Sequence, residues 1–119
     1  AYAPAKAAVI SITECLAAEW GRSGVRVNAI SPGYTLTQAL QAAIDRGDRN
    51  PDELTSQAAM GRLVKPSEVA DAVGFLLSPA ASAITGINLP VDAGWLAGST
   101  WMTYGGVPAA RQSQSTGVK

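Results

Sequence analysis

The longest regular pattern in the chain is helical and runs without a breaker from Lys6 to Trp20. Apolar side chains recur there at three- and four-residue spacing, which is typical of one helix face. That face carries Val9, Ile12, Leu16 and Trp20. The helix is either a core helix of a large domain or a helix that packs on a sheet with one face and on a partner subunit with the other. Gly21 and Gly24 predict a turn at its end.

Two short segments show the pattern of strands. Residues 25–31 alternate apolar and polar side chains and end at Pro32-Gly33, and residues 84–91 form a second strand-like segment that contains Gly86. Residues 92–94, Asp-Ala-Gly, then predict a turn. Helix, tight turn, strand and Pro-Gly in this order are typical of the second half of a crossover unit, so we predict an α/β fold with a parallel sheet.

A second amphipathic helix is predicted over residues 66–77, because Pro66 and Glu68 suit a first helical turn. In open α/β sheets, ligands bind beyond the carboxyl ends of the strands, and the loop of residues 32–37 occupies that place. The loop also fits a simple connection in which Thr35 or Thr37 caps the following helix.

The remaining segments have weaker patterns. Residues 38–46 and 51–59 predict two short helices separated by a polar break, and they form either a lid over a site or an ordinary surface helical hairpin. Beyond residue 95 the pattern dissolves into glycines with scattered aromatic side chains, which we expect to dock on another surface. Residues 111–119 are polar and predict a mobile tail.

Composition narrows the possible functions. Among 119 residues, 47% are apolar and 15% are charged, which fits a globular, soluble protein with a packed core. The 9 basic and 9 acidic residues balance and form no basic run, so a nucleic-acid partner is not expected. No apolar run is long enough for a membrane span. The absence of histidine removes Ser-His-Asp triads and His-based metal sites, and the single Cys15 fits a reducing cytoplasm.

Tyr2 and Lys6 are the strongest candidates for chemistry. Residues four apart on a helix lie one turn above each other, so the phenol and the ammonium share a face. A fixed positive charge nearby favours the phenolate, which makes the tyrosine able to give or take a proton at a substrate oxygen. Taken alone, the two residues could equally be an exposed pair on an ordinary helix.

The order of several short motifs resembles the C-terminal half of a classical short-chain dehydrogenase/reductase. The motifs are Tyr2-x-x-x-Lys6, Val25-Arg26-Val27-Asn28-Ala29-Ile30-Ser31-Pro32-Gly33, Gly61-Arg62 with Pro66-Ser67-Glu68-Val69-Ala70, Ile84-Thr85-Gly86, and Val91-Asp92-Ala93-Gly94. The resemblance covers about residues 1–95 and implies half of a Rossmann-type, doubly wound parallel sheet. Ala93 stands where this family usually has a glycine, and the segment 96–119 extends beyond the family's usual end.

The resemblance also implies roles for individual residues. Tyr2 would be the general acid or base, and Lys6 would assist it and bind the nicotinamide ribose. Pro32 and Gly33 would belong to the loop that runs past the nicotinamide of NAD or NADP. Thr37 would contact the carboxamide or the pyrophosphate of the same cofactor. The backbone of Thr35 would join the same contact, and residues 38–60 would form the variable substrate lid. No metal site is implied.

We therefore expect residues 1–95 to be one half of a single Rossmann-fold domain, with residues 96–119 as a partly mobile extension. The glycine-rich phosphate loop, the catalytic serine and the residue that selects NAD or NADP would belong to an upstream half of the same fold. We expect a cytoplasmic homotetramer, because the family and the apolar helix surface both imply one.

The expected activity is interconversion of a secondary alcohol and a ketone by hydride transfer. The mixed charges of residues 45–53 favour a small polyol, sugar or hydroxy compound over a substrate delivered on a phosphopantetheine carrier. The alternatives are a 3-oxoacyl thioester reductase of the same family, or a non-catalytic subunit that forms the oligomer.

Overall fold

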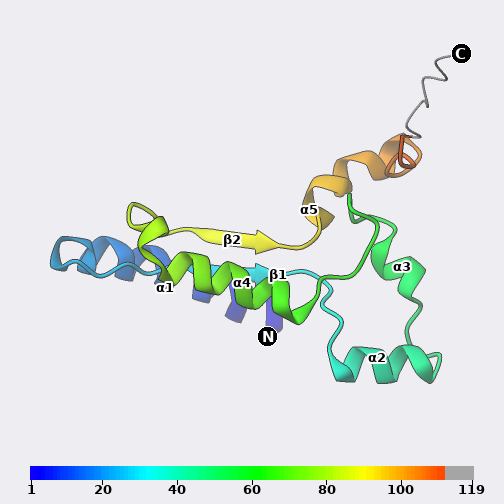
Figure 1. The fold of residues 1–119 in the computed structure, drawn as a ribbon, viewed down its shortest axis with the longest axis horizontal. Helices are drawn as coiled ribbons and strands as arrows, with labels where there is room; N and C mark the ends of the chain where they lie inside the picture. Colours follow the sequence, from blue (N-terminus) through cyan, green and yellow to red (C-terminus); the bar gives the residue numbers. More distant parts are fainter. Residues whose placement is uncertain (112–119) are drawn as a thin grey trace, which may run out of the picture.

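The computed structural model describes residues 1–111 and shows helices packed on both sides of a short parallel sheet (Figure 1). The elements in chain order are α1 (Tyr2–Trp20), η1 (Gly21–Ser23), β1 (Ala29–Pro32), α2 (Gln38–Asp45), α3 (Pro51–Thr55), α4 (Pro66–Leu77), η2 (Pro79–Ala81), β2 (Asn88–Val91), α5 (Trp95–Gly98) and η3 (Ser99–Tyr104). The α/β arrangement and the parallel sheet confirm the predicted fold class.

Strands β1 and β2 pair in parallel, with Ala29 opposite Asn88 and Pro32 opposite Val91. A parallel pair needs a long crossover connection, and here the crossover carries α2, α3 and α4. Helix α4 contacts both strands and lies in front of them in Figure 1, whereas α1 contacts β1 from behind. The carboxyl ends of both strands therefore lie at the same edge of the sheet.

Both strands begin later than predicted, because side chains take over the backbone hydrogen bonds ahead of the ladder. The Asn28 amide nitrogen donates to the Ile84 carbonyl at 3.0 Å, and its oxygen accepts from the Ile87 N–H at 3.2 Å. Arg26 also donates to the Ile84 carbonyl, at 3.1 Å. Residues 25–28 and 84–87 therefore lie side by side without forming a regular ladder, and the predicted strands 25–31 and 84–91 were too long.

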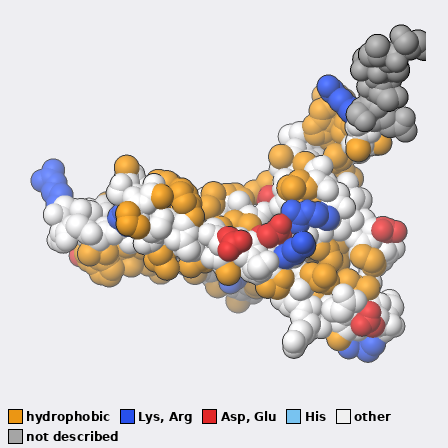
Figure 2. Space-filling view, viewed as in Figure 1, with side chains coloured by type: hydrophobic (Ala, Val, Ile, Leu, Met, Phe, Trp, Pro, Cys, Tyr) orange, Lys and Arg blue, Asp and Glu red, His pale blue; other side chains and the backbone are white. Residues whose placement is uncertain are grey.

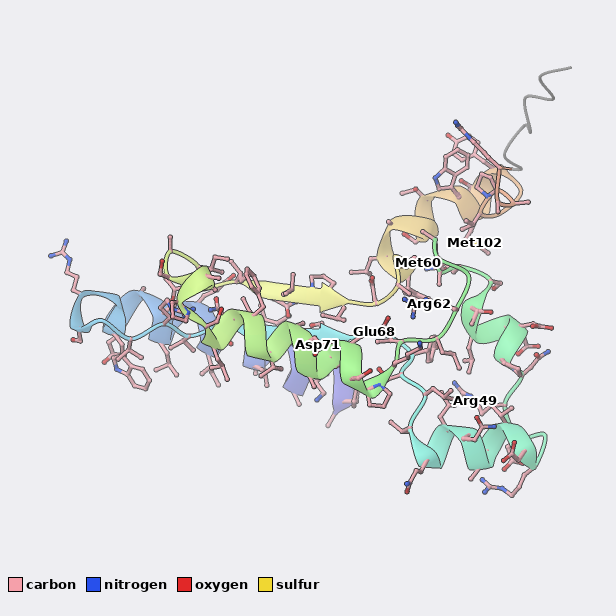
Figure 3. The ribbon with its side chains drawn as sticks, in the orientation of Figure 1. Arg49, Met60, Arg62, Glu68, Asp71 and Met102 are labelled. Atoms are coloured by element: carbon pink, nitrogen blue, oxygen red, sulfur yellow. The ribbon has the colours of Figure 1, made fainter. Side chains whose placement is uncertain are left out.

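The three longer helices lie where the pattern predicted them. α1 ends at Trp20, and Gly24, with a φ of 80°, caps the η1 turn that follows it. Thr37 caps the start of α2, because its hydroxyl oxygen accepts from the Leu40 N–H at 3.2 Å. At the start of α4 the Glu68 carboxylate accepts from the Lys65 N–H at 2.8 Å and pairs with both terminal nitrogens of Arg62. Figure 3 shows Arg62 and Glu68 next to each other at this helix end.

Two predictions about the shorter elements were wrong. Helix α3 ends at Thr55, so the helix predicted over residues 51–59 is shorter than expected. Residues 95–104 are helical, as α5 followed by η3, although their sequence shows no clear period. The predicted tail of residues 111–119 falls almost entirely outside the described residues.

The described residues leave much apolar surface uncovered. The buried apolar side chains are mostly small, whereas Ile12 is 55% exposed and Leu77 is 77% exposed. Figure 2 shows hydrophobic side chains along the surface that covers α1 and α4. The radius of gyration is 18.4 Å, compared with about 13 Å for a compact domain of roughly 100 residues. The elements therefore form an open layer whose apolar faces need a further covering surface.

Candidate active site

Tyr2 and Lys6 lie on one face of α1, at the helix end that approaches the carboxyl end of β1. The Lys6 ammonium nitrogen is 5.4 Å from the centre of the Tyr2 ring. Tyr2 is 78% exposed, so its phenol is accessible to a ligand. The Lys6 ammonium therefore lies over the ring of Tyr2 on the same helix face.

A cavity of about 410 Å³ opens beside Tyr2 at the carboxyl edge of the sheet. Its lining comes from α1, β1, the loop after β1, β2 and the start of α5, namely from Tyr2, Ser31, Pro32, Gly33, Tyr34, Pro90, Asp92, Trp95 and Leu96. This volume falls within the range of small-molecule pockets. Among the described residues that line it, Asp92 is the only charged one.

A second cavity, of about 300 Å³, is lined mostly by residues of α1 and β1, among them Tyr2 and Lys6. Tyr2, Ser31 and Pro32 line both cavities, so they form the boundary between them. Ser31 is held in place by its hydroxyl, which donates to the Asn88 amide oxygen at 2.7 Å. Tyr2 therefore borders both cavities.

Gly33 is required by the close packing at this edge. A Cβ atom added at Gly33 would lie 2.7 Å from the Asp92 Cα. The Gly33 N–H donates to the Val91 carbonyl at 2.9 Å. Contacts this short do not occur for real side chains, so only glycine brings the loop after β1 against the turn after β2. The predicted pair Pro32 and Gly33 thus lies directly beside Tyr2.

Thr35 and Thr37 lie farther along the same loop and line neither cavity. The Thr35 hydroxyl donates to the Gly33 carbonyl at 3.0 Å, and Thr35 forms an isolated parallel bridge with Val64. Thr37 caps α2. The structure therefore joins Tyr2, Lys6, Pro32 and Gly33 at one place, and it shows Thr35 and Thr37 in the supporting loop.

Several cavity residues did not stand out in the sequence. Ser31 and Asn88 meet because the two strands pair in register. The only available signal was a polar side chain at the end of one strand-like segment, Ser31, and one inside the other, Asn88. Trp95 meets Tyr34 edge-on, with ring centres 6.1 Å apart, although residues 34 and 95 are far apart in the chain. Asp92 was predicted only as part of a turn.

Residues 1–111 hold neither a metal-ligand cluster nor a membrane-spanning helix. No cluster of three or more potential metal-ligating side chains occurs among them. No helix among them is long and apolar enough to cross a membrane.

The structure is an α/β protein with a cavity at the carboxyl edge of its parallel strands. Its similarity to known proteins shows its family. The family described as enoyl-(acyl carrier protein) reductase matches residues 1–96. A protein of Sinorhizobium fredii named an uncharacterized short-chain type dehydrogenase/reductase is 42% identical over 96 residues, which cover 81% of this chain and 18% of that protein. The chain belongs to the short-chain dehydrogenase/reductase family, and its sheet and helices are part of a Rossmann-type fold.

Other relatives carry more specific names. Galactitol 2-dehydrogenase (L-tagatose-forming) of Cereibacter sphaeroides is 46% identical over 94 residues, which cover 79% of this chain and 37% of that protein. The chain thus spans less than half the length of these curated relatives.

Solved structures agree on the fold. One named ribose-5-phosphate isomerase, from Brucella melitensis 16M, has a TM-score of 0.84 and 54% identity, and the match covers 92% of this chain and 42% of that one. The structure of ElxO with NADP bound has a TM-score of 0.76 and 35% identity, and the match covers 81% of this chain and 39% of that one.

Proposed function

We propose that this chain provides the proton-transfer side of an NAD(P)-dependent oxidoreductase that interconverts a secondary alcohol and a ketone. The observation that carries the proposal is the position of Tyr2. Its accessible phenol lies beside the Lys6 ammonium, on the boundary between two cavities at the carboxyl edge of the sheet. In the proposed enzyme, Tyr2 would stand as a proton donor between the cofactor and the substrate.

The roles follow from the charges and positions. The nicotinamide, when bound, would supply or accept the hydride. Tyr2 would hold the proton at the substrate oxygen, with the Lys6 ammonium beside its ring. Pro32 and Gly33 would shape the wall beside the nicotinamide. Thr35 and Thr37 would hold the loop that carries this wall, with cofactor contacts from their backbone or hydroxyl groups.

The proposed enzyme needs a second half of the same fold. We assign residues 1–95 to the C-terminal half of one Rossmann-fold domain and residues 96–119 to an extension. Support comes from the open, apolar layer formed by α1, the sheet and α4, and from the greater length of the relatives. The upstream half would cover part of this surface and supply the phosphate-binding loop. The remaining exposed helix surface would form a homotetramer in the cytoplasm.

The substrate we propose is a small neutral polyol or sugar. The identity to a galactitol dehydrogenase supports it. The cavity beside Tyr2 also has no Lys or Arg among its described lining residues, so it offers no partner for a phosphate group. This argues against the isomerase activity that the Brucella structure's name would indicate.

Two alternatives remain distinguishable by experiment. The family description names an enoyl-(acyl carrier protein) reductase, which favours an acyl thioester as substrate. The extensive exposed helix surface would also suit a non-catalytic, oligomer-forming subunit.

A single assay panel separates these functions. The full-length protein is tested for NAD- and NADP-dependent oxidation of galactitol, reduction of a 3-oxoacyl and an enoyl thioester, and isomerisation of ribose 5-phosphate. Polyol oxidation supports the proposal. Turnover of a thioester or of the sugar phosphate alone would replace it, and the absence of all turnover and of nicotinamide binding would favour the non-catalytic subunit.

A further inference from the structure

The turn after β2 fixes the start of α5 through one carboxylate. One Asp92 carboxylate oxygen accepts from the Gly94 N–H at 2.9 Å, and the other accepts from the Leu96 N–H at 3.1 Å. The Asp92 backbone carbonyl accepts from the Trp95 N–H at 3.1 Å. All three bonds orient the residues that form the far wall of the cavity beside Tyr2.

The same turn is also bound to the segment that follows α3. The Ala59 N–H donates to the Gly94 carbonyl at 3.2 Å, and the Met60 N–H donates to the Ala93 carbonyl at 3.0 Å. The Gln57 side chain donates to the Trp95 carbonyl at 3.1 Å. Figure 3 places Met60 beside the path into α5. The wall is therefore held by hydrogen bonds between the turn after β2 and the segment after α3, which are far apart in the chain.

Close packing leaves this wall little freedom to shift. A Cβ atom at Gly98 would lie 1.7 Å from the Gln57 carbonyl oxygen, so α5 approaches the segment after α3 as closely as a backbone can. The Trp95 and Tyr34 rings meet edge-on at 78°. Both rings line the same cavity as Tyr2.

We infer that Trp95 determines substrate specificity and that Asp92 is the residue that positions it; this inference rests on the proposed function. A substrate whose reacting oxygen lies at Tyr2 extends across the cavity toward the Trp95 and Tyr34 rings. Aromatic rings offer apolar contact to the carbon chain of a polyol. The negative charge of Asp92 disfavours anions there. The wall thus selects long, neutral polyols over short or phosphorylated ones.

Substitution of Trp95 tests the contact in the full-length protein. Trp95→Ala should raise the KM for galactitol about tenfold, while kcat stays within about twofold and the KM for glycerol, which is too short to reach the wall, is unchanged. Trp95→Phe should have a smaller effect in the same direction, and it keeps the test valid if the alanine variant folds poorly. Trp101→Ala, which removes an indole from a separate small cavity, is the matched control.

Substitution of Asp92 tests the positioning role. Asp92→Asn keeps one oxygen for the Gly94 N–H and loses the acceptor for the Leu96 N–H. It should raise the KM for galactitol about threefold without changing that for glycerol. The matched control is Asp71→Asn on the exposed surface of α4 (Figure 3).

The outcomes separate this inference from the proposed function. If the wild-type enzyme oxidises galactitol and both Trp95 variants keep its KM, the inference is overturned and the proposed function stands. If the Asp92 variant changes the KM for glycerol and galactitol alike, its effect is not through Trp95 and the positioning role is refuted. If the wild-type enzyme binds NAD(P) and oxidises no polyol, the proposed function fails, and the inference fails with it.

Discussion

A single phenol group would control the proposed chemistry, because Tyr2 lines both cavities and has the Lys6 ammonium beside its ring. Tyr2→Phe keeps the ring and removes only the hydroxyl. We expect kcat in the full-length enzyme to fall by at least about 100-fold, because removal of a positioned acid or base typically costs that much. Thermal unfolding should be unchanged, since the side chain is largely exposed. A variant that retains more than a tenth of the wild-type kcat would contradict the role.

Gly33 provides a second test at the scale of one residue. Gly33→Ala places a methyl group 2.7 Å from the Asp92 Cα, so the loop after β1 must move away from the turn after β2. We expect weaker NAD(P) binding and a destabilisation of about 1–3 kcal/mol, which is typical of overpacking. Isothermal titration and chemical denaturation measure the two effects.

The matched control for this substitution lies in α4. Gly74 has no neighbour within 4 Å of the added Cβ, and Gly74→Ala should stabilise the helix by about 0.5–1 kcal/mol. If Gly33→Ala proves as harmless as Gly74→Ala, the close approach of the two loops is not required.

At the scale of the elements, the start of α4 depends on one ion pair. Hydrogen bonds from the Arg62 guanidinium and from the Lys65 N–H lower the pKa of Glu68 to about 2, and the same pairing raises the pKa of Arg62. A carboxylate whose folded-state pKa is depressed stabilises the fold above its unfolded pKa, and this stabilisation is lost as the pH falls through the folded value.

Glu68→Gln should therefore lower the Tm of the full-length protein at neutral pH. The difference from wild type should stay constant down to about pH 4.5 and shrink as the pH falls toward 2. Glu14→Gln is the control, because this carboxylate is exposed on α1, away from the start of α4. Thermal scans between pH 2 and 7 measure the Tm of both variants and of the wild type. A Tm difference between Glu68→Gln and the wild type that does not change with pH would refute the role of the ion pair.

The helices were predictable because their signals are local. The apolar period placed α1 and α4, and the threonines of the preceding loop indicated the start of α2, which Thr37 rather than Thr35 caps. The strands were overextended because the sequence does not show that Asn28 bonds to the backbone in place of a ladder partner. α5 was missed because its four residues are too few to show a helical period.

The residues of the candidate site were likewise predictable only where their signal is local in the sequence. The spacing of Tyr2 and Lys6 follows from one helix, so the sequence could place them together. Gly33 was predicted from its position after a strand. The far wall was not predictable, because Trp95 joins the cavity only through the register of β1 with β2 and through its contact with Tyr34.

At the scale of the whole molecule, the described residues form a layer that cannot bury its own apolar surface. Its large side chains remain accessible on α1 and α4, and the molecule extends over 61 × 46 × 29 Å. Contiguous exposed apolar surface of this kind marks an interaction site. In the proposed enzyme, an upstream half of the fold would cover part of this surface, and the outward faces of the helices would remain available to other subunits.

Ile12 tests the assembly that this surface predicts. It is 55% exposed on α1, so Ile12→Lys should leave the fold of each subunit intact and place a charge in a subunit interface. We expect light scattering to show a tetramer for the full-length wild-type protein and smaller species for the variant. Gln41→Lys, on the exposed side of α2, adds the same charge away from α1 and should keep the wild-type mass. A monomeric wild-type protein would refute the tetramer, whereas a tetramer that tolerates Ile12→Lys would exclude this face of α1 from the interface.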